Sequence, residues 1–237
     1  FSKSYKAKLI NFLRNNTTIE TGGNKVFDGT YNHLLHIPEE FAELIIELKK
    51  IHKKDKVFKN FLEIGFSHGI ANTILNKFFN FSQIVAIDKF GAHINGATLL
   101  PNLRFKNLVL ICGDSQNKTT INTLKNFGKF DLVFIDGDHE YNVVKNDFLN
   151  VKRMIHKKSV IIFHDINLDK SGSKKFWGEL KKNKKYKLKE IICRKYNFNY
   201  GTGILKLVWF ILKTFPFNIY IHFTMKKKIH KDKEINK

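Results

Sequence analysis

Acidic residues and glycines directly follow two short apolar segments of this sequence. Residues 61–69 read FLEIGFSHG, and residues 131–141 read DLVFIDGDHEY. A buried parallel strand ends in this way where its carboxyl end opens onto a ligand crevice. Glycine lets the backbone approach a ligand closely, and carboxylates accept hydrogen bonds or hold a cation. The two segments therefore predict a nucleoside-cofactor site next to a chemical site at one edge of a sheet.

The turn after the first of these apolar runs differs from the dinucleotide-binding fingerprint. Ser67 stands where Gly-x-Gly-x-x-Gly has its second glycine, which disfavours binding of a pyrophosphate. The pattern Glu63-x-Gly65-x-x-x-Gly69 instead resembles the first motif of class I S-adenosylmethionine-dependent methyltransferases. In that family the turn holds the amino-acid end of a cofactor that has no phosphate. The resemblance implies a cofactor-binding turn made of Glu63, Gly65, Ser67 and Gly69.

Two further predicted strands also end at acidic residues. Asp88 ends the run at 83–88, where an acid can bind both hydroxyls of a ribose. Asp114 and Ser115 follow the run at 108–112, and Asp114 resembles the acid that faces the adenine amino group in the same family. Asp and Ser also commonly cap helices, so helix capping is the alternative for each of them. We include all three residues in the predicted cofactor site.

A more specific resemblance lies in the second half of the chain. The sequences FIDGDHEY at 134–141 and IIFHD at 161–165 resemble small methyltransferases of the macrocin O-methyltransferase and cephalosporin-hydroxylase-like branch. HIPEE at 36–40 and YGTGI at 200–204 also resemble that branch, and the resemblance covers about residues 20–208. It implies an O-methyltransferase that uses S-adenosylmethionine and holds a divalent cation, usually Mg²⁺, beside the methyl group.

Carried over by position, the cation ligands would be Asp136, His164 and Asp165. Relatives more often have an acid or an amide where this chain has His164. An imidazole is a softer ligand than Mg²⁺ prefers, because that ion favours oxygen. Three alternatives therefore stay open: His164 supports the ligands without touching the ion, the ion differs, or there is no ion.

His139 lies three residues after Asp136. Related enzymes with Asp-x-x-His use this histidine as a general base, which would make His139 and Asp136 the catalytic pair. An alcohol is a poor nucleophile at neutral pH, so a cation that lowers its pKa and an imidazole that accepts its proton would both help. The alternative is that His139 caps a helix or hydrogen-bonds Asp136.

Alternating strands and helices must position these residues. They predict an α/β fold with a Rossmann-like, doubly wound sheet of seven mostly parallel strands, an antiparallel last strand and helices on both faces. The last two strands follow each other without a helix, which predicts an antiparallel hairpin at the sheet edge. We expect strands near 59–64, 83–88, 108–112, 130–135, 159–163, 186–193 and 203–209, and helices near 41–50, 69–79, 116–127, 141–155 and 172–183.

The chain divides into three predicted parts: an N-terminal cap or lid segment with a helix at 1–50, an S-adenosylmethionine-binding catalytic domain at 51–210, and a basic aromatic tail at 211–237. Forty-two Lys and Arg against 21 Asp and Glu give a formal charge of +21. This charge either attracts anionic partners or reflects compositional drift. The two cysteines form no disulfide or metal motif, and we expect Cys112 in the core.

Three function classes remain in competition. The first is an O-methyltransferase acting on a hydroxyl of a sugar, a glycan or a small polar metabolite. The second is an RNA or other nucleic-acid methyltransferase, disfavoured because no Pro-Pro motif follows the fourth strand. The third is a non-catalytic membrane-surface protein whose basic tail contacts anionic lipid. We expect a cytoplasmic protein, at the inner membrane face if the tail binds lipid, and a homo-oligomer stays open.

Overall fold

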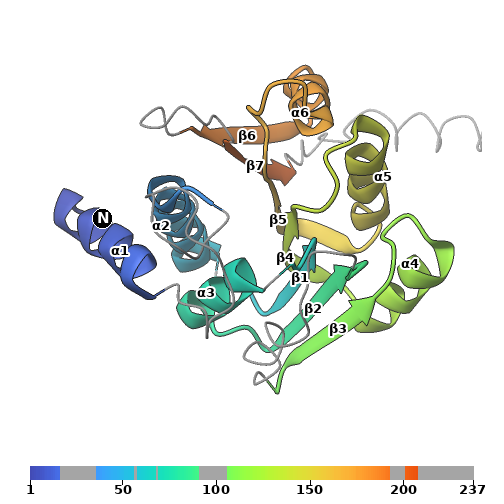
Figure 1. The fold of residues 1–237 in the computed structure, drawn as a ribbon, viewed down its shortest axis with the longest axis horizontal. Coiled ribbons are helices and arrows are strands. Elements are labelled where there is room, and N and C mark those ends of the chain that lie inside the picture. Colours follow the sequence, from blue (N-terminus) through green and yellow to red (C-terminus); the bar gives the residue numbers. More distant parts are fainter. Residues whose placement is uncertain (17–35, 56–57, 68, 91–105, 193–200, 208–237) are drawn as a thin grey trace, which may run out of the picture.

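A seven-stranded sheet forms the centre of the molecule (Figure 1). The computed structural model describes residues 1–16, 36–55, 58–67, 69–90, 106–192 and 201–207. The strands lie in the order β3-β2-β1-β4-β5-β7-β6, and only β7 runs antiparallel to its neighbours. Their bounds are β1 Asn60–Ile64, β2 Gln83–Asp88, β3 Leu108–Cys112, β4 Phe130–Ile135, β5 Ile155–Phe163, β6 Tyr186–Ile191 and β7 Thr202–Leu207. The predicted fold class is confirmed.

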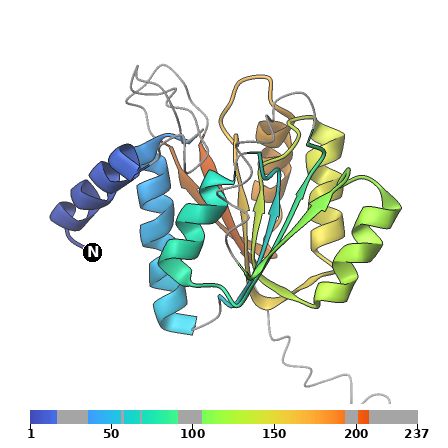
Figure 2. The ribbon, with the colours of Figure 1, turned by 60° about the horizontal axis from the view of Figure 1, so that its bottom comes forward.

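Helices cover both faces of the sheet, as Figure 2 shows. On one face lie α2 (Pro38–Asp55) and α3 (Ile70–Phe79), with α1 (Lys3–Asn16) packed against α2. On the other face lie α4 (Lys118–Leu124), α5 (Tyr141–Val151) and α6 (Gly172–Lys181), and a short 3₁₀ turn, η4 (Lys125–Phe127), follows α4. The central strands are therefore buried on both sides, which explains their nearly continuous apolar sequences.

The sequence predicts a helix near 41–50 but none at the position of α1. Its apolar face is narrow, with Leu9 and Leu13 buried four residues apart. Two ion pairs add to this contact: Lys6 with Glu43 (2.6 Å) and Arg14 with Glu39 (2.7 Å). Such contacts across 25 or more residues leave no local periodic signal. The helix therefore depends on α2 rather than on its own sequence pattern.

Other details also differ from the expectation. Cys112 is exposed instead of buried, because β3 is an edge strand in which no residue is fully buried. The final hairpin is present, but β7 is inserted between β5 and β6. The predicted tail at 211–237 lies outside the described residues, as does much of the predicted cap at 17–35. Among the helices that the structure describes, none combines the length and apolarity needed to cross a bilayer.

Strand pairing brings the carboxyl ends of β1, β2 and β4 to one edge. Ile64, the last residue of β1, lies opposite Ile87 on β2 and Ile135 on β4. The hydrogen-bond ladder continues one step further: the Gly65 N–H donates to the Ile87 carbonyl (2.9 Å), and the Asp136 N–H donates to the Ile64 carbonyl (2.8 Å). The residues that follow β1 and β4 therefore lie side by side.

This contact requires glycine at position 65. Gly65 has a φ of 89°, which L side chains rarely adopt, and a Cβ there would overlap the backbone carbonyl of Asp136. Gly178 in α6 offers a comparison, because a Cβ at that position would meet nothing within 4 Å.

We expect Gly65→Ala to lower the free energy of unfolding by about 2–4 kcal/mol, since backbone strain and overpacking add. The same substitution at Gly178 should raise it by about 0.5–1 kcal/mol, because alanine favours a helix interior. Urea unfolding of the two variants measures both effects. Equal stability of the two variants would contradict the close approach of β1 and β4.

Candidate active site

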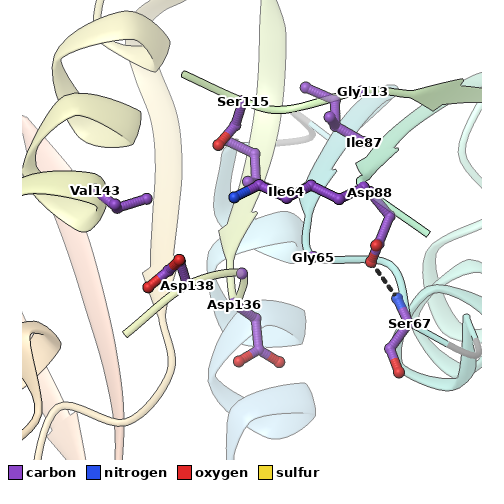
Figure 3. A pocket seen from close by; sticks show the side chains of 12 residues that line it. Ile64, Gly65, Ser67, Ile87, Asp88, Gly113, Ser115, Asp136, Asp138 and Val143 are labelled. Atoms are coloured by element: carbon purple, nitrogen blue, oxygen red, sulfur yellow. Dashed lines mark hydrogen bonds between the residues drawn. The ribbon is translucent and has the colours of Figure 1, made fainter. Parts of the chain in front are cut away.

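A cavity of about 290 Å³ opens at the carboxyl edge of the sheet (Figure 3). Its walls come from the ends of β1, β2 and β4, the loop after β3 and the start of α5. Parallel α/β sheets bind their ligands in this position. The residues that line it are Ile64, Gly65, Ser67, Ile87, Asp88, Lys89, Gly113, Ser115, Asp136, Gly137, Asp138 and Val143.

The Asp88 carboxylate is fixed in the cavity wall by two backbone donors. The Ser67 N–H donates to Asp88 Oδ2 (2.8 Å), as Figure 3 shows, and the Phe90 N–H donates to Oδ1 (2.8 Å). Ser67 itself has a positive φ of 47°, so the glycine turn is folded tightly against the end of β2. A carboxylate oxygen has a second lone pair, so Asp88 can still accept hydrogen bonds from a ligand.

The loop after β3 contributes Gly113 and Ser115 to the cavity, while the Asp114 side chain is turned to Lys89. The Gln116 N–H donates to Asp114 Oδ1 (2.8 Å), and Lys89 Nζ lies 3.2 Å from Oδ2. The Gln116 amide first, and Lys89 second, hold the pKa of Asp114 below its usual value. Asp114 is thus anionic, but it does not line the cavity, and its contact with adenine stays a prediction.

A smaller cavity of about 40 Å³ adjoins the glycine turn. Gly65, Ser67 and Asp136 line both cavities, and Glu63 and His36 line the smaller one. Glu63 is 1% exposed, and burial raises its pKa well above the usual value. Repulsion from Asp136 and Asp88 adds to that shift. Burial therefore favours the neutral form of Glu63, and a cationic group bound nearby would favour the charged form.

The predicted glycine at 69 has a different place. It is the left-handed N-cap of α3, with a φ of 72°, and its carbonyl accepts the Thr73 hydroxyl (2.7 Å). It lines neither cavity. Gly69 therefore shapes the turn that presents Gly65 and Ser67, and a direct role in ligand binding stays a prediction.

Asp136 lies beside two buried histidines. His164, held at the end of β5 by donation from its N–H to the Ile135 carbonyl (3.1 Å), places Nδ1 3.0 Å from Asp136 Oδ1. His36, just before α2, places Nε2 3.5 Å from Asp136 Oδ2. The two rings also touch, with His36 Nδ1 3.0 Å from His164 Nε2. We refer to His36, Asp136 and His164 as the His–Asp–His group.

Charges in this group are unequal. Burial opposes a proton on His164, but Asp136 and Asp165 outweigh it and raise the pKa of His164 well above its usual value. Burial and the charge on His164 lower the pKa of His36 to about 4, so His36 is neutral. Burial acts against the charge on Asp136 too, yet its histidine neighbours bring the pKa of Asp136 below the usual value. Without a ligand, His164 is therefore the cation of the group.

Asp165 connects this group to His139. Asp165 Oδ1 lies 3.3 Å from His164 Nδ1, and Oδ2 lies 3.1 Å from His139 Nδ1. Asp165 is buried with a φ of 57°, whereas about half of the His139 side chain is exposed. The N-cap of α5 is Glu140, so His139 does not cap that helix, and its imidazole faces Asp165 rather than Asp136. The pair has the form of an imidazole oriented by a carboxylate.

These residues do not fit the implied Mg²⁺ site. Among the described residues, the potential ligands that lie within 4.8 Å of one another are His36, Asp136 and His164. Asp165 adjoins this group through His164 but is not part of it. Mg²⁺ favours an octahedral set of oxygens, and this group offers two imidazoles for one carboxylate. The donor set is thus richer in nitrogen than that ion prefers.

Two residues of the site were missed in the sequence. His36 opens the HIPEE segment at 36–40, but nothing in that segment indicates a contact with His164, which is 128 residues away. Asp147 is fully buried and accepts from Gln116 Nε2 (2.7 Å), so it supports the loop that carries Asp114 and Ser115. It could have been found, because it falls on the same helical face as the buried Val144, Phe148 and Val151.

Comparison with known proteins agrees with this geometry. Residues 62–166 match a family model described as a methyltransferase domain, and this range contains the cavity-lining ends of β1, β2, β3 and β4. This part of the chain is therefore a methyltransferase domain. A search of curated protein sequences found no relative.

Solved structures share the fold at low identity. An O-methyltransferase from Bacillus cereus, in complex with SAH, has a TM-score of 0.57 at 14% identity, over 88% of this chain and 92% of that chain. The O-methyltransferase TomG from Streptomyces achromogenes, in complex with SAM, has a TM-score of 0.56 at 15% identity, over 74% and 82%. The N-methyltransferase NodS from Bradyrhizobium japonicum has a TM-score of 0.52 at 14% identity, over 72% of this chain and 97% of that chain. These likenesses establish the fold.

Asp147 predicts a pH-dependent difference in stability. Burial raises its pKa to about 7 in the folded protein, from 3.8. The folded state therefore holds a proton that the unfolded state has lost, and Asp147 destabilises the fold by about 1.4 kcal/mol per pH unit between about 4 and 7. Asp147→Asn, which mimics the protonated form, should gain thermal stability over the natural protein as pH rises from 4 to 8. Asp169 is exposed, so Asp169→Asn should show no such gain. Parallel curves of melting temperature against pH for the natural protein and the two variants would contradict the prediction.

Proposed function

We propose that this chain is an S-adenosylmethionine-dependent O-methyltransferase acting on a hydroxyl of a sugar, a glycan or a small polar metabolite. The observation that carries the proposal is the single cavity edge at which Asp88, the glycine turn and Asp136 meet. The hydroxyl acceptor and its chemical class rest on the resemblance of residues 134–141 and 161–165 to the macrocin O-methyltransferase branch.

The cavity walls match the parts of the cofactor. Asp88 would accept hydrogen bonds from the ribose hydroxyls, and the loop with Gly113 and Ser115 would lie beside the adenine. The ammonium and sulfonium of S-adenosylmethionine are cationic, and buried Glu63, next to the glycine turn, faces no cationic group in the described part of the chain. Two of the solved neighbours are described as complexes with SAH or SAM.

The chemistry requires one proton acceptor. An oxygen lone pair of the acceptor attacks the methyl carbon as the carbon–sulfur bond breaks, which leaves neutral S-adenosylhomocysteine. The hydroxyl proton moves to Nε2 of His139, whose Nδ1 faces Asp165 (3.1 Å). Asp165 holds the imidazole orientation and stabilises the imidazolium that forms. The protein's remaining task is to align the reactants, because the sulfonium is a good leaving group.

The charge of +21 favours a second candidate, methylation of a nucleic acid. Methylation of an exocyclic base nitrogen would not need the His139–Asp165 pair. Transfer of methyl groups to RNA and not to a panel of nucleotide sugars and glycan fragments would select this candidate.

Loss of the Asp88 carboxylate should weaken cofactor binding selectively. We expect Asp88→Ala to raise the Kd for S-adenosylmethionine about 10- to 150-fold, the effect of about 1.5–3 kcal/mol from hydrogen bonds to a charged acceptor. Isothermal titration calorimetry measures this. Asp131→Ala is a matched control, since Asp131 also accepts from two backbone amides, those of Lys59 and Asn60, at the other edge of the sheet. Equal losses in the two variants would mean that Asp88 only supports the fold.

Removal of the proposed base should affect turnover and not cofactor affinity. His139→Ala should lower kcat about 10²- to 10⁴-fold for the acceptor found in the panel. His156→Ala should leave kcat unchanged, since His156 forms a similar pair with Asp131 (2.6 Å) at the opposite edge. Full turnover by His139→Ala would remove the proposed role of His139.

A further inference from the structure

The His–Asp–His group offers donors that the proposed reaction does not use. We infer that His36, Asp136 and His164 bind a first-row transition-metal ion, such as Mn²⁺, Co²⁺ or Zn²⁺, in preference to Mg²⁺. The resemblance implied Mg²⁺ as the usual ion, left open that the ion differs, and did not include His36 among the ligands. Metal binding at this group does not depend on the proposed methyl transfer.

Distances within the group suit a single ion. Neighbouring ligands at about 2.1 Å from a metal lie about 3.0–3.4 Å apart, depending on the coordination angle. Asp136 Oδ1 and His164 Nδ1 are 3.0 Å apart, and Asp136 Oδ2 and His36 Nε2 are 3.5 Å apart. One ligand atom from each of the three residues lies within 4.8 Å of the other two, so the side chains must move closer together to hold one ion.

Packing against two aromatic rings fixes the orientation of the His36 ring. The His36 ring stacks on Phe41 at 5.0 Å and 14°, and it also lies 5.5 Å from the Phe134 ring. Phe134 is buried in β4, two residues before Asp136, so the same strand positions the ring and the carboxylate. A ligand held by rigid packing loses little entropy when an ion binds.

Charge and access also favour a cation. Asp136 and Asp165 both face His164, so two carboxylates lie within one small region. His36 and Asp136 line the smaller cavity together with Gly65 and Ser67, and Asp136 also lines the larger one. An ion in this group would therefore be reached from the cofactor cavity.

The donor types select the ion. Two imidazoles and one carboxylate suit Mn²⁺, Fe²⁺, Co²⁺, Ni²⁺ or Zn²⁺. Mg²⁺ prefers oxygen ligands and keeps several waters, so a nitrogen-rich group binds it poorly. The competing explanation is a buried, hydrogen-bonded polar group that binds no ion, in which His164 supplies the positive charge.

Metal binding can be measured without an activity assay. Tag-free protein is stripped with a chelator and titrated with Co²⁺, Mn²⁺, Zn²⁺ or Mg²⁺ by calorimetry, with metal analysis after gel filtration. We expect one Co²⁺ per chain with ligand-field absorption in the visible range, and binding of Mg²⁺ at least about tenfold weaker. No stoichiometric ion, or Mg²⁺ bound as tightly as Co²⁺, would overturn the inference.

Variants assign the ligands. His36→Ala should weaken Co²⁺ binding at least about tenfold, whereas His156→Ala, in the His–Asp pair at the opposite edge, should bind Co²⁺ as the natural protein does. If His36→Ala does not fold, X-ray absorption of the Zn²⁺-loaded natural protein decides: two imidazole nitrogens at about 2.0–2.1 Å are expected. One imidazole or none, or unchanged Co²⁺ binding by folded His36→Ala, would refute His36 as a ligand.

Discussion

The site depends on how the protein compensates the negative charges of several carboxylates that lie close together. Parallel strands end together, so acids at or just after the ends of β1 to β5 are brought to one edge, where burial makes the charges of Glu63 and Asp165 costly. The structure compensates them in different ways. Backbone amides hold Asp88, Lys89 faces Asp114, and histidines face Asp136 and Asp165. Glu63 faces no cation among the described residues, and burial raises its pKa well above the usual value.

These differences divide the edge into two regions. On the side of β2 and β3, the carboxylates of Asp88 and Asp114 are anchored by backbone donors and suit hydrogen bonding to neutral groups such as hydroxyls and amines. On the side of β4 and β5, imidazoles face carboxylates, which suits proton transfer or metal binding. Gly65 lies where the two regions meet, and the absence of a side chain there lets β1 approach β4.

The sequence predicts much of this arrangement because its signals are local. Apolar runs that end in acids identify β1, β2 and β4 closely, and the acids at 88 and 136 are found in the cavity wall. Signals fail where contacts are long-range. The helix α1 depends on ion pairs with α2, the exposure of Cys112 depends on the edge position of β3, and His36 meets His164 only in the folded chain. Asp147 is an intermediate case, since its helical spacing reveals burial but not its partner Gln116.

A crystal structure of the chain with S-adenosylhomocysteine tests the central claim most directly. The account predicts the nucleoside in the cavity at the carboxyl edge, with ribose hydroxyls within hydrogen-bond distance of Asp88, the amino-acid end beside Glu63 and the sulfur directed to Asp136. A nucleoside bound elsewhere, or one whose ribose does not contact Asp88, would contradict it.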